Sequence, residues 1–259
     1  MQLPNLKPIG TEVPPCKICG SASTLYGVVD FNRSCEEVRG RFLPLSGVPV
    51  NYRRCPTCGF LFTDSFDRWT EADFKEYIYN DDYVVVDPDY VETRPAANAG
   101  LINHLFERDK ARLRVLDYGG GNGVLSQALT AAGFLSAQTY DPFSPEHATL
   151  PGEMFDIVTC FETFEHSPNP LATIDVIAER TADPGIVIFS TLVQPEDFDN
   201  LGLNWWYIGP RNGHISLFTR QALGMAWESR GYTFGSFDDN LHVAFRRCPD
   251  FARHLTGAP

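Results

Sequence analysis

The sequence has few basic residues, no long apolar run and no recognisable export signal. Lys and Arg number 21 against 33 Asp and Glu, a formal net charge of −12, and such a surface repels the phosphate backbone of nucleic acids. No apolar run approaches the roughly 18–20 residues that span a bilayer. The first residues, MQLPNLKPIG, lack the basic and then apolar pattern of a signal peptide. We therefore expect a soluble, cytoplasmic protein with no membrane partner and no nucleic-acid partner held by broad charge attraction.

What the chain does have is enough apolar material for a packed core. It contains 259 residues, of which 43% are hydrophobic and 21% charged, a composition typical of globular proteins. Changes in composition along the chain predict an N-terminal module at residues 1–66, a connector or helical cover at 67–110 and an α/β domain at 111–259.

Seven cysteines are an odd number, and without an export signal a disulfide framework is not expected. Four of them form two Cys-x-x-Cys pairs, each followed by a glycine that can take a positive φ and close a metal-binding turn. Two such turns supply a closed tetrahedral site, so we predict structural zinc at Cys16, Cys19, Cys55 and Cys58. Two unrelated pairs of buried thiols are the alternative. Residues 23–30 and 48–54 read as strands between the pairs, and Cys35, which has acidic neighbours, is taken as a spare.

A nucleotide-binding pattern begins near the middle of the chain. An apolar helical pattern at residues 98–110 precedes a strand at 112–118, a glycine-rich turn at 119–123 and a helix at 124–132. Strand, glycine turn and helix start a βαβ unit in which the backbone passes close to a ligand.

Acidic residues mark the ends of the first two strands of this unit. Asp117 stands just before the glycine turn, and Asp141 ends a second strand at 135–140, where a carboxylate can accept hydrogen bonds from ribose hydroxyls. A third buried strand follows at 155–161. A dehydrogenase is the rival interpretation, but its G-x-G-x-x-G pattern usually has no acidic residue immediately before it.

With the segments VLDYGGGNG, YDPF and FDIVTCFETFEH, residues 110–247 resemble the class I S-adenosylmethionine-dependent methyltransferases, in particular a subgroup with an E-x-x-E-H motif after the fourth strand. The resemblance implies a doubly wound, mostly parallel α/β sheet of Rossmann-like type, with a small N-terminal zinc-ribbon module. It also implies S-adenosylmethionine as cofactor, bound by Asp117, Gly119, Gly121, Asp141 and Phe161.

One segment departs from this family's pattern. Only residues 142–154 separate Asp141 from Phe155, too few for the helix, strand and helix that normally lie there. We expect the third strand to be cut down, and elements of the N-terminal module or a tyrosine-rich connector (Tyr77, Tyr79, Tyr83) to close the adenine pocket.

The motif Glu162, Glu165 and His166 has the spacing i, i+3 and i+4, which would place all three side chains on one face if the segment is helical. Alternatively, Glu165 caps the next helix and His166 packs in its first turn. The resemblance implies one use of these residues: in small-RNA 2′-O-methyltransferases and some quinone O-methyltransferases, similar residues hold a divalent ion beside the acceptor oxygen. In the RNA enzymes a later histidine, which His214 resembles, joins them. In zinc-bearing deoxysugar C-methyltransferases, a histidine in a similar H-x-S-x-F context is instead the general base. There it usually follows a glutamate, whereas here it follows Gly213.

The last third of the chain adds an aromatic insertion between a strand at 185–191 and a helix at 220–230 that Thr219 caps. Trp206 and Tyr207, next to Trp205, could stack on a sugar or cover the cofactor, or form a satellite hydrophobic cluster. Residues 232–237 and 241–247 are expected to be the final antiparallel hairpin.

The sequence thus predicts an S-adenosylmethionine-dependent methyltransferase with a small-molecule acceptor, a sugar, sugar nucleotide or natural-product hydroxyl. His214, His166, Glu162 and Glu165 are its catalytic candidates, with a second divalent ion as one way of using them. Two alternatives stay open. One is an RNA methyltransferase whose zinc module grips the substrate through Arg33, Arg39, Arg41, Arg53 and Arg54, and the other is a non-catalytic cofactor-binding scaffold.

Overall fold

The computed structural model describes Pro4, Leu6 and residues 13–256, so most of the segment to which the signal-peptide expectation applies lies outside the described residues. The chain divides into two compact units. Unit 1 comprises Met1–Pro88, Phe164–Leu171 and Leu192–Ala226, and unit 2 comprises Asp89–Thr163, Ala172–Thr191 and Trp227–Pro259. The division predicted at residues 66 and 110 stays a prediction about domains. Among the described residues, no helix has both the length and the apolar character needed to cross a bilayer.

Unit 2 is built on a six-stranded sheet in the order β5-β4-β6-β7-β10-β9. Neighbouring strands from β5 to β7 are parallel, whereas β10 pairs antiparallel with both β7 and β9. This mostly parallel order confirms the Rossmann-like fold and the final hairpin. The strands are β4 (Arg114–Tyr118), β5 (Ser136–Tyr140), β6 (Phe155–Cys160), β7 (Thr181–Ser190), β9 (Thr233–Ser236) and β10 (Leu241–Phe245).

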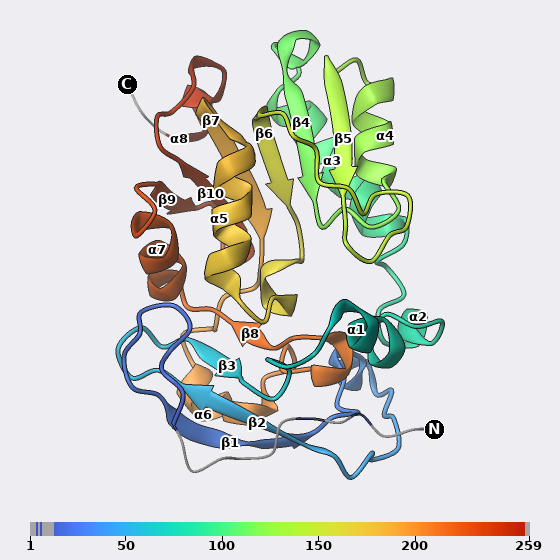
Figure 1. Ribbon diagram of the computed structural model, residues 1–259, viewed down its shortest axis with the longest axis vertical. Helices are drawn as coiled ribbons and strands as arrows, with labels where there is room; N and C mark the ends of the chain where they lie inside the picture. Colours follow the sequence, from blue (N-terminus) through green and yellow to red (C-terminus); the bar gives the residue numbers. More distant parts are fainter. Residues whose placement is uncertain (1–3, 5, 7–12, 257–259) are drawn as a thin grey trace. The chain divides into compact units, whose positions relative to one another are not determined.

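Helices cover this sheet on both faces. On one face lie α3 (Thr93–Leu105) and α4 (Val124–Ala131). Their buried apolar side chains form one core with residues of β4, β6 and β7. Alternation along a strand turns Leu116 and Val158 to the opposite face, where α5 (Pro170–Arg180) crosses the sheet in Figure 1. The C-terminal helix α8 (Arg253–Thr256) is a single turn.

Helix α3 corrects the expected helix at residues 98–110 at both ends. It starts five residues earlier, because Pro95 lies in its first turn, where a missing N–H costs no hydrogen bond. It ends at Leu105, and a 3₁₀ turn at Lys110–Arg112 leads into β4.

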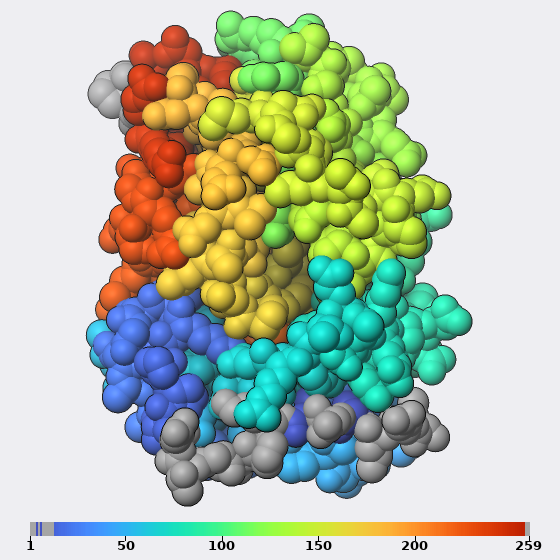
Figure 2. Space-filling model, in the orientation of Figure 1, coloured from blue at the N-terminus to red at the C-terminus, as the bar shows by residue number. Residues whose placement is uncertain are grey.

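The shortened segment after β5 contains turns and no strand or helix. β5 is therefore the edge of the sheet, as expected from the length of residues 142–154. Atoms of this part of the chain, yellow-green in Figure 2, lie on the visible face, and Met154 is 47% exposed.

Unit 1 contains a second, four-stranded antiparallel sheet in the order β1-β2-β3-β8. Its first three strands come from the cysteine-bearing segment, and the fourth comes from the aromatic insertion more than 150 residues later. The strands are β1 (Thr24–Asp30), β2 (Pro49–Arg54), β3 (Leu61–Thr63) and β8 (Ser216–Leu217), and the short helices are α1 (Glu71–Tyr77), α2 (Tyr83–Val86) and α6 (Phe198–Leu201).

Helix α7 (Arg220–Glu228) follows β8 directly. The Ala222 N–H donates to Thr219 Oγ1 at 3.0 Å, which confirms Thr219 as its N-cap.

Candidate functional site

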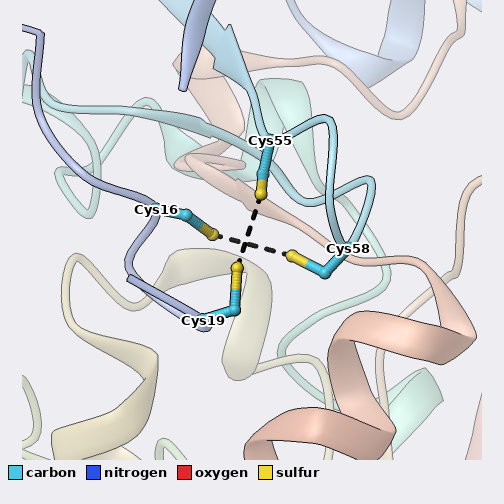
Figure 3. Close-up of side chains that lie close together, drawn as sticks. All are labelled: Cys16, Cys19, Cys55 and Cys58. Carbon is cyan, nitrogen blue, oxygen red and sulfur yellow. Dashed lines mark hydrogen bonds between the residues drawn. The ribbon is translucent and has the colours of Figure 1, made fainter. Parts of the chain in front are cut away.

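The four cysteines of the two Cys-x-x-Cys pairs converge in unit 1 (Figure 3). Cys16 Sγ lies 3.6 Å from Cys58 Sγ, and Cys19 Sγ lies 3.5 Å from Cys55 Sγ. A tetrahedral ion with Zn–S bonds of about 2.3 Å holds its sulfurs roughly 3.8 Å apart. The four thiols therefore fit a zinc ion, and four sulfurs would complete its coordination.

The two turns that carry these thiols have the same backbone geometry. In each, the glycine N–H donates to the carbonyl of the first cysteine, Gly20 to Cys16 at 3.0 Å and Gly59 to Cys55 at 2.9 Å. Gly20 and Gly59 have φ angles of +72° and +73°, which favour glycine. Matching turns of this kind are typical of structural zinc sites.

Crowding of the thiols separates their acidities. Contact with the Cys58 thiol lowers the pKa of Cys16 to about 5. The same contact, together with burial, raises the pKa of Cys58, and burial raises that of Cys55. Two neighbouring thiolates repel each other, so ionisation of one of these thiols disfavours ionisation of the other. A divalent cation would remove the conflict because it binds both sulfurs as thiolates.

Several hydrogen bonds connect the cysteine segment to residues 214–219 within unit 1. Thr219 Oγ1 donates to the Cys58 carbonyl at 2.6 Å, and the Thr63 N–H donates to the Ile215 carbonyl at 3.0 Å. The fully buried Tyr52 of β2 donates its hydroxyl to the His214 carbonyl at 2.6 Å. The backbone of His214 is therefore held by the sheet that leads into the second cysteine pair.

Glu165, His166 and His214 form a second cluster in unit 1, with one ligand-type atom from each lying within 4.8 Å of the others. Glu165 and His166 belong to a 3₁₀ turn, Phe164–His166. The Ile215 N–H donates to the Glu165 carbonyl at 2.8 Å, which brings the residue after His214 against this turn. Glu165 is fully buried and His214 is 7% exposed.

Gly213 explains why His166 can lie so close to His214. Its φ is +89°, and a Cβ at this position would lie 2.9 Å from His166 Nδ1. A glutamate, which usually stands here in the sugar C-methyltransferases of the resemblance, would be strained and would displace His166. The imidazole centroids of His166 and His214 are 5.0 Å apart.

Glu162 does not lie on a helical face with Glu165 and His166. It belongs to unit 2, has a φ of 48° and precedes the 3₁₀ turn. Its N–H donates to Ser190 Oγ at 2.9 Å, and Ser190 Oγ donates to Glu162 Oε1 at 2.7 Å. Ser190 thus fixes both its backbone and its carboxylate.

The glycine turn of unit 2 lies between the ends of β4 and β5. The Gly119 N–H donates to the Tyr140 carbonyl at 2.7 Å, and the Gly121 N–H donates to Asp141 Oδ2 at 2.9 Å. A Cβ on Gly121 would meet nothing within 4 Å, whereas one on Gly119 would lie 2.3 Å from Thr163 Oγ1. Of the two glycines predicted to contact the cofactor, Gly121 therefore faces open space and Gly119 is packed against Thr163.

Gly120, which the sequence did not single out, is also sterically required. A Cβ there would lie 2.1 Å from Asp117 Oδ2. Asp117 is 3% exposed and accepts a hydrogen bond from Thr159 Oγ1 at 2.8 Å. Burial, reinforced by the charge of Asp141 and opposed by the Thr159 hydrogen bond, raises the pKa of Asp117 to about 7.

Asp141 orders the turns on both sides of its strand end. Besides accepting from Gly121, its carboxylate accepts the Phe143 N–H at 2.7 Å. Each carboxylate oxygen can accept a further hydrogen bond, so the group remains suited to ribose hydroxyls. Phe161, the remaining residue predicted for the cofactor, is 9% exposed and belongs to the hydrophobic core of unit 2.

The two predicted substrate residues of the aromatic insertion, although adjacent in sequence, differ in their exposure to solvent. Trp206 is 43% exposed, but Tyr207 is 3% exposed. Tyr207 donates its hydroxyl to Glu165 Oε1 at 2.5 Å, and its ring centroid lies 4.2 Å from that of His214. Of the two, Trp206 has the exposed surface that stacking on a sugar requires.

Cys35, for which the sequence predicted no role, lies beside His214, with its Sγ 3.4 Å from His214 Nδ1. Its N–H donates to Asn212 Oδ1 at 2.8 Å. The 179 positions between Cys35 and His214 carry no local pattern that could have revealed this neighbour.

The match to a family model covers more than half of the chain. A family model described as a methyltransferase domain matches residues 90–235, which is 146 of 259 residues. The match contains the glycine turn, Asp141 and the E-x-x-E-H motif.

Individual relatives match over shorter stretches. The ubiquinone biosynthesis O-methyltransferase of Aromatoleum aromaticum (strain DSM 19018 / LMG 30748 / EbN1) is 37% identical over 122 residues, which cover 37% of this chain and 47% of that protein. Its namesake from Hydrogenovibrio crunogenus (strain DSM 25203 / XCL-2) is 36% identical over 101 residues, covering 30% and 42%. The chain thus spans less than half the length of these relatives.

Among solved structures, the plantazolicin methyltransferase BpumL, in complex with pentazolic desmethylPZN analog and SAH, has a TM-score of 0.49 at 13% identity. The alignment covers 69% of this chain and 96% of that one. The fold assignment depends on the strand order of unit 2 rather than on this likeness.

Proposed function

Given that the chain belongs to the methyltransferase domain family, we propose that it transfers a methyl group from S-adenosylmethionine to a hydroxyl of a small, oxygen-rich acceptor. Sugars, sugar nucleotides and natural-product phenols or alcohols are the acceptor classes that we favour. The relatives named as O-methyltransferases support oxygen as the acceptor atom.

The observation that carries this proposal is the glycine turn of unit 2. Gly121 faces open space beside Asp141, at the carboxyl ends of β4 and β5, where ligands bind in open α/β sheets. In our proposal Asp141 accepts hydrogen bonds from the ribose, and the backbone at Gly121 approaches the methionine part. When bound, the cofactor supplies a methyl group on a positively charged sulfur that is already activated for transfer.

What the protein must add is alignment of the acceptor and removal of its proton. We assign proton removal to His214, whose Nε2 would take the hydroxyl proton as the oxygen becomes methylated. Glu165 and His166 surround this imidazole, and Trp206 offers an exposed ring for the acceptor.

Two metal roles belong to this proposal. The four cysteines would hold zinc as a structural ion. The alternative use of Glu165, His166 and His214 is a second divalent ion that would lower the pKa of the acceptor hydroxyl. Metal analysis separates these schemes, because base catalysis by His214 requires one ion per chain and the alternative requires two.

The charges of unit 1 disfavour RNA as the substrate. Each arginine that could grip RNA faces a carboxylate of the same unit: Arg33 with Glu37, Arg39 and Arg41 with Glu36, Arg53 with Asp64 and Arg54 with Asp199. Paired arginines add little to the attraction of a phosphate backbone. A small acceptor therefore fits better.

The test begins with calorimetric titration of S-adenosylmethionine into the purified chain. We expect binding, and we expect Asp141→Asn to weaken it by about 10- to 100-fold, the loss typical of a hydrogen bond to a charged group. Asp175→Asn, which removes an exposed carboxylate paired with Arg230 elsewhere in unit 2, should leave the affinity unchanged.

Methyl transfer is then measured with catechol and UDP-glucose as probes of phenol and sugar hydroxyls. Salt-sensitive RNA binding, with methylation of RNA but of neither probe, would support the RNA alternative. Failure to bind the cofactor would support a non-catalytic scaffold and overturn the proposal.

A further inference from the structure

The position of the proton on His214 follows from its partner. His214 Nδ1 lies 2.8 Å from the backbone carbonyl oxygen of Tyr207. A carbonyl oxygen only accepts hydrogen bonds, so the short contact assigns the proton to Nδ1, which donates it. Cys35 Sγ, 3.4 Å from the same nitrogen, is more distant and a weaker hydrogen-bonding group. In the neutral imidazole the lone pair is then on Nε2.

Tyr207 contacts His214 in a second way and reaches Glu165 as well. Its ring packs on the His214 imidazole at a centroid distance of 4.2 Å, and its hydroxyl donates to Glu165 Oε1 at 2.5 Å. The Leu192 N–H, 3.4 Å away, donates to the same hydroxyl. Tyr207 thus contacts His214 through its backbone carbonyl and its ring, and Glu165 through its hydroxyl.

These contacts close a ring of hydrogen bonds. Glu165 is joined to Tyr207 through its carboxylate and to Ile215 through its carbonyl, and Tyr207 is joined to His214, the neighbour of Ile215. Rotation of the His214 imidazole would break the Nδ1 hydrogen bond, and rotation of the Glu165 carboxylate would break the hydroxyl bond. Because all three side chains are at most 7% exposed, water cannot readily replace either bond.

We propose that Tyr207 is a positioning residue rather than a substrate contact: its carbonyl fixes His214 as the Nδ1-protonated tautomer, and its hydroxyl orients Glu165 beside that imidazole. This inference rests on the proposed function, since it assumes that His214 Nε2 accepts the proton of the acceptor hydroxyl. It assigns no new chemical step. The proton moves from the acceptor oxygen to Nε2, and Tyr207 keeps its own hydrogen.

The first test reads the tautomer directly and needs no activity. In histidine-¹⁵N-labelled full-length protein, the His214 signals, assigned by their loss in His214→Gln, should show a protonated Nδ1 and an unprotonated Nε2. Tyr207→Phe keeps the carbonyl and the ring, so it should preserve this tautomer. A proton on Nε2 in the wild-type protein would overturn the proposal.

The second test measures whether Tyr207 acts through Glu165. We compare Tyr207→Phe, Glu165→Gln and the double variant, with Tyr232→Phe as control because it removes another buried tyrosine hydroxyl, in unit 2. We expect Tyr207→Phe to lower kcat by up to about 100-fold, as misplacement of a reacting group does, without changing the affinity for S-adenosylmethionine. The double variant should lose no more than Glu165→Gln alone.

Independent losses that multiply in the double variant, or a Tyr207→Phe enzyme that behaves like Tyr232→Phe, would contradict the positioning role. If the wild-type protein does not bind S-adenosylmethionine, the proposed function fails instead. Two measurements that need no activity then decide whether Tyr207 orients His214 and Glu165. One is the His214 tautomer, and the other is the unfolding free energy of Tyr207→Phe, Glu165→Gln and the double variant.

Discussion

At the scale of single residues, Asp117 shows how the fold changes the acidity of one group. Its carboxyl is 3% exposed, and burial is the main cause that raises its pKa from 3.8 to about 7. The folded state therefore binds this proton more tightly than the unfolded state. Ionisation of Asp117 therefore costs no stability below about pH 4, and its cost grows as the pH rises to about 7 and then stays constant.

Asp117→Asn should remove this cost. The variant should be more stable than the wild-type protein, and we expect this difference in unfolding free energy to be on the order of 2 kcal/mol larger at pH 8 than at pH 5. Urea unfolding at the two pH values measures the difference. Equal differences at both values would show that Asp117 does not titrate in this window. Glu153→Gln, which changes an exposed carboxylate of the same unit, is the control and should show no such trend.

The sequence predicted features that depend on neighbouring residues, and it did not predict contacts between residues far apart in the chain. The spacing of Cys16 and Cys19 and the glycine after each pair predicted the metal-binding turns. By contrast, Glu162 was expected on a possible helix, but Ser190, 28 positions away, holds it at a φ of 48°. The burial of Tyr207 against Glu165 depends on a contact across 42 positions, which no periodicity records.

At the scale of elements, Thr219 joins the start of α7 to the second cysteine turn. Its hydroxyl accepts the Ala222 N–H at 3.0 Å and donates to the Cys58 carbonyl at 2.6 Å. Gly59 leaves room for it, since a Cβ there would lie 2.7 Å from Thr219 Cγ2. One side chain therefore stabilises both a helix end and a turn that carries two predicted zinc ligands.

Thr219→Ala should lower the free energy of unfolding by about 1–2 kcal/mol, because a cap and a buried hydrogen bond are lost together. It should also speed the release of zinc to a chelator. Chemical denaturation and a colorimetric zinc assay measure the two effects. Thr219→Ser retains the hydroxyl and is expected to stay near wild type; an equal loss in both variants would point to the methyl group instead.

Most predicted strands and helices lie within two residues of the observed ones; the exceptions, β7 and α3, begin four and five residues earlier than expected. Expected strands at 23–30, 112–118 and 155–161 lie within two residues of β1, β4 and β6, because runs of β-branched and aromatic residues between turn signals are local features. The helix around residue 100 shifted by five positions, since its apolar spacing did not specify where Pro95 would be accommodated. The pairing of β8 with β3 was not anticipated, because two-residue strands have no pattern of their own.

At the scale of the whole molecule, the proposed ligands divide between the two units. The residues proposed for S-adenosylmethionine belong to unit 2, whereas the four cysteines and His214 belong to unit 1. Structural zinc sites in small modules contribute about 10 kcal/mol or more to folding. Loss of zinc should therefore affect unit 1 first.

Removing zinc with a thiol reagent and chelator should abolish methyl transfer while leaving the calorimetric affinity for S-adenosylmethionine within a few-fold of its starting value. Native mass spectrometry before and after treatment counts the ions, with one per chain expected at the start. A variant with all four cysteines changed to serine should purify without that ion. Parallel loss of cofactor binding and of zinc would show that the two units do not respond separately.

Unit 1 is assembled from three stretches of the chain, and its sheet is complete only when β8 joins β3. A fusion or truncation that moves the first 88 residues to another protein would leave behind β8, His214 and the Glu165 turn. The first 88 residues are therefore not expected to fold as an independent domain. Recombination between related genes could exchange them intact only by carrying two internal inserts along with them, so these three stretches are expected to be inherited together.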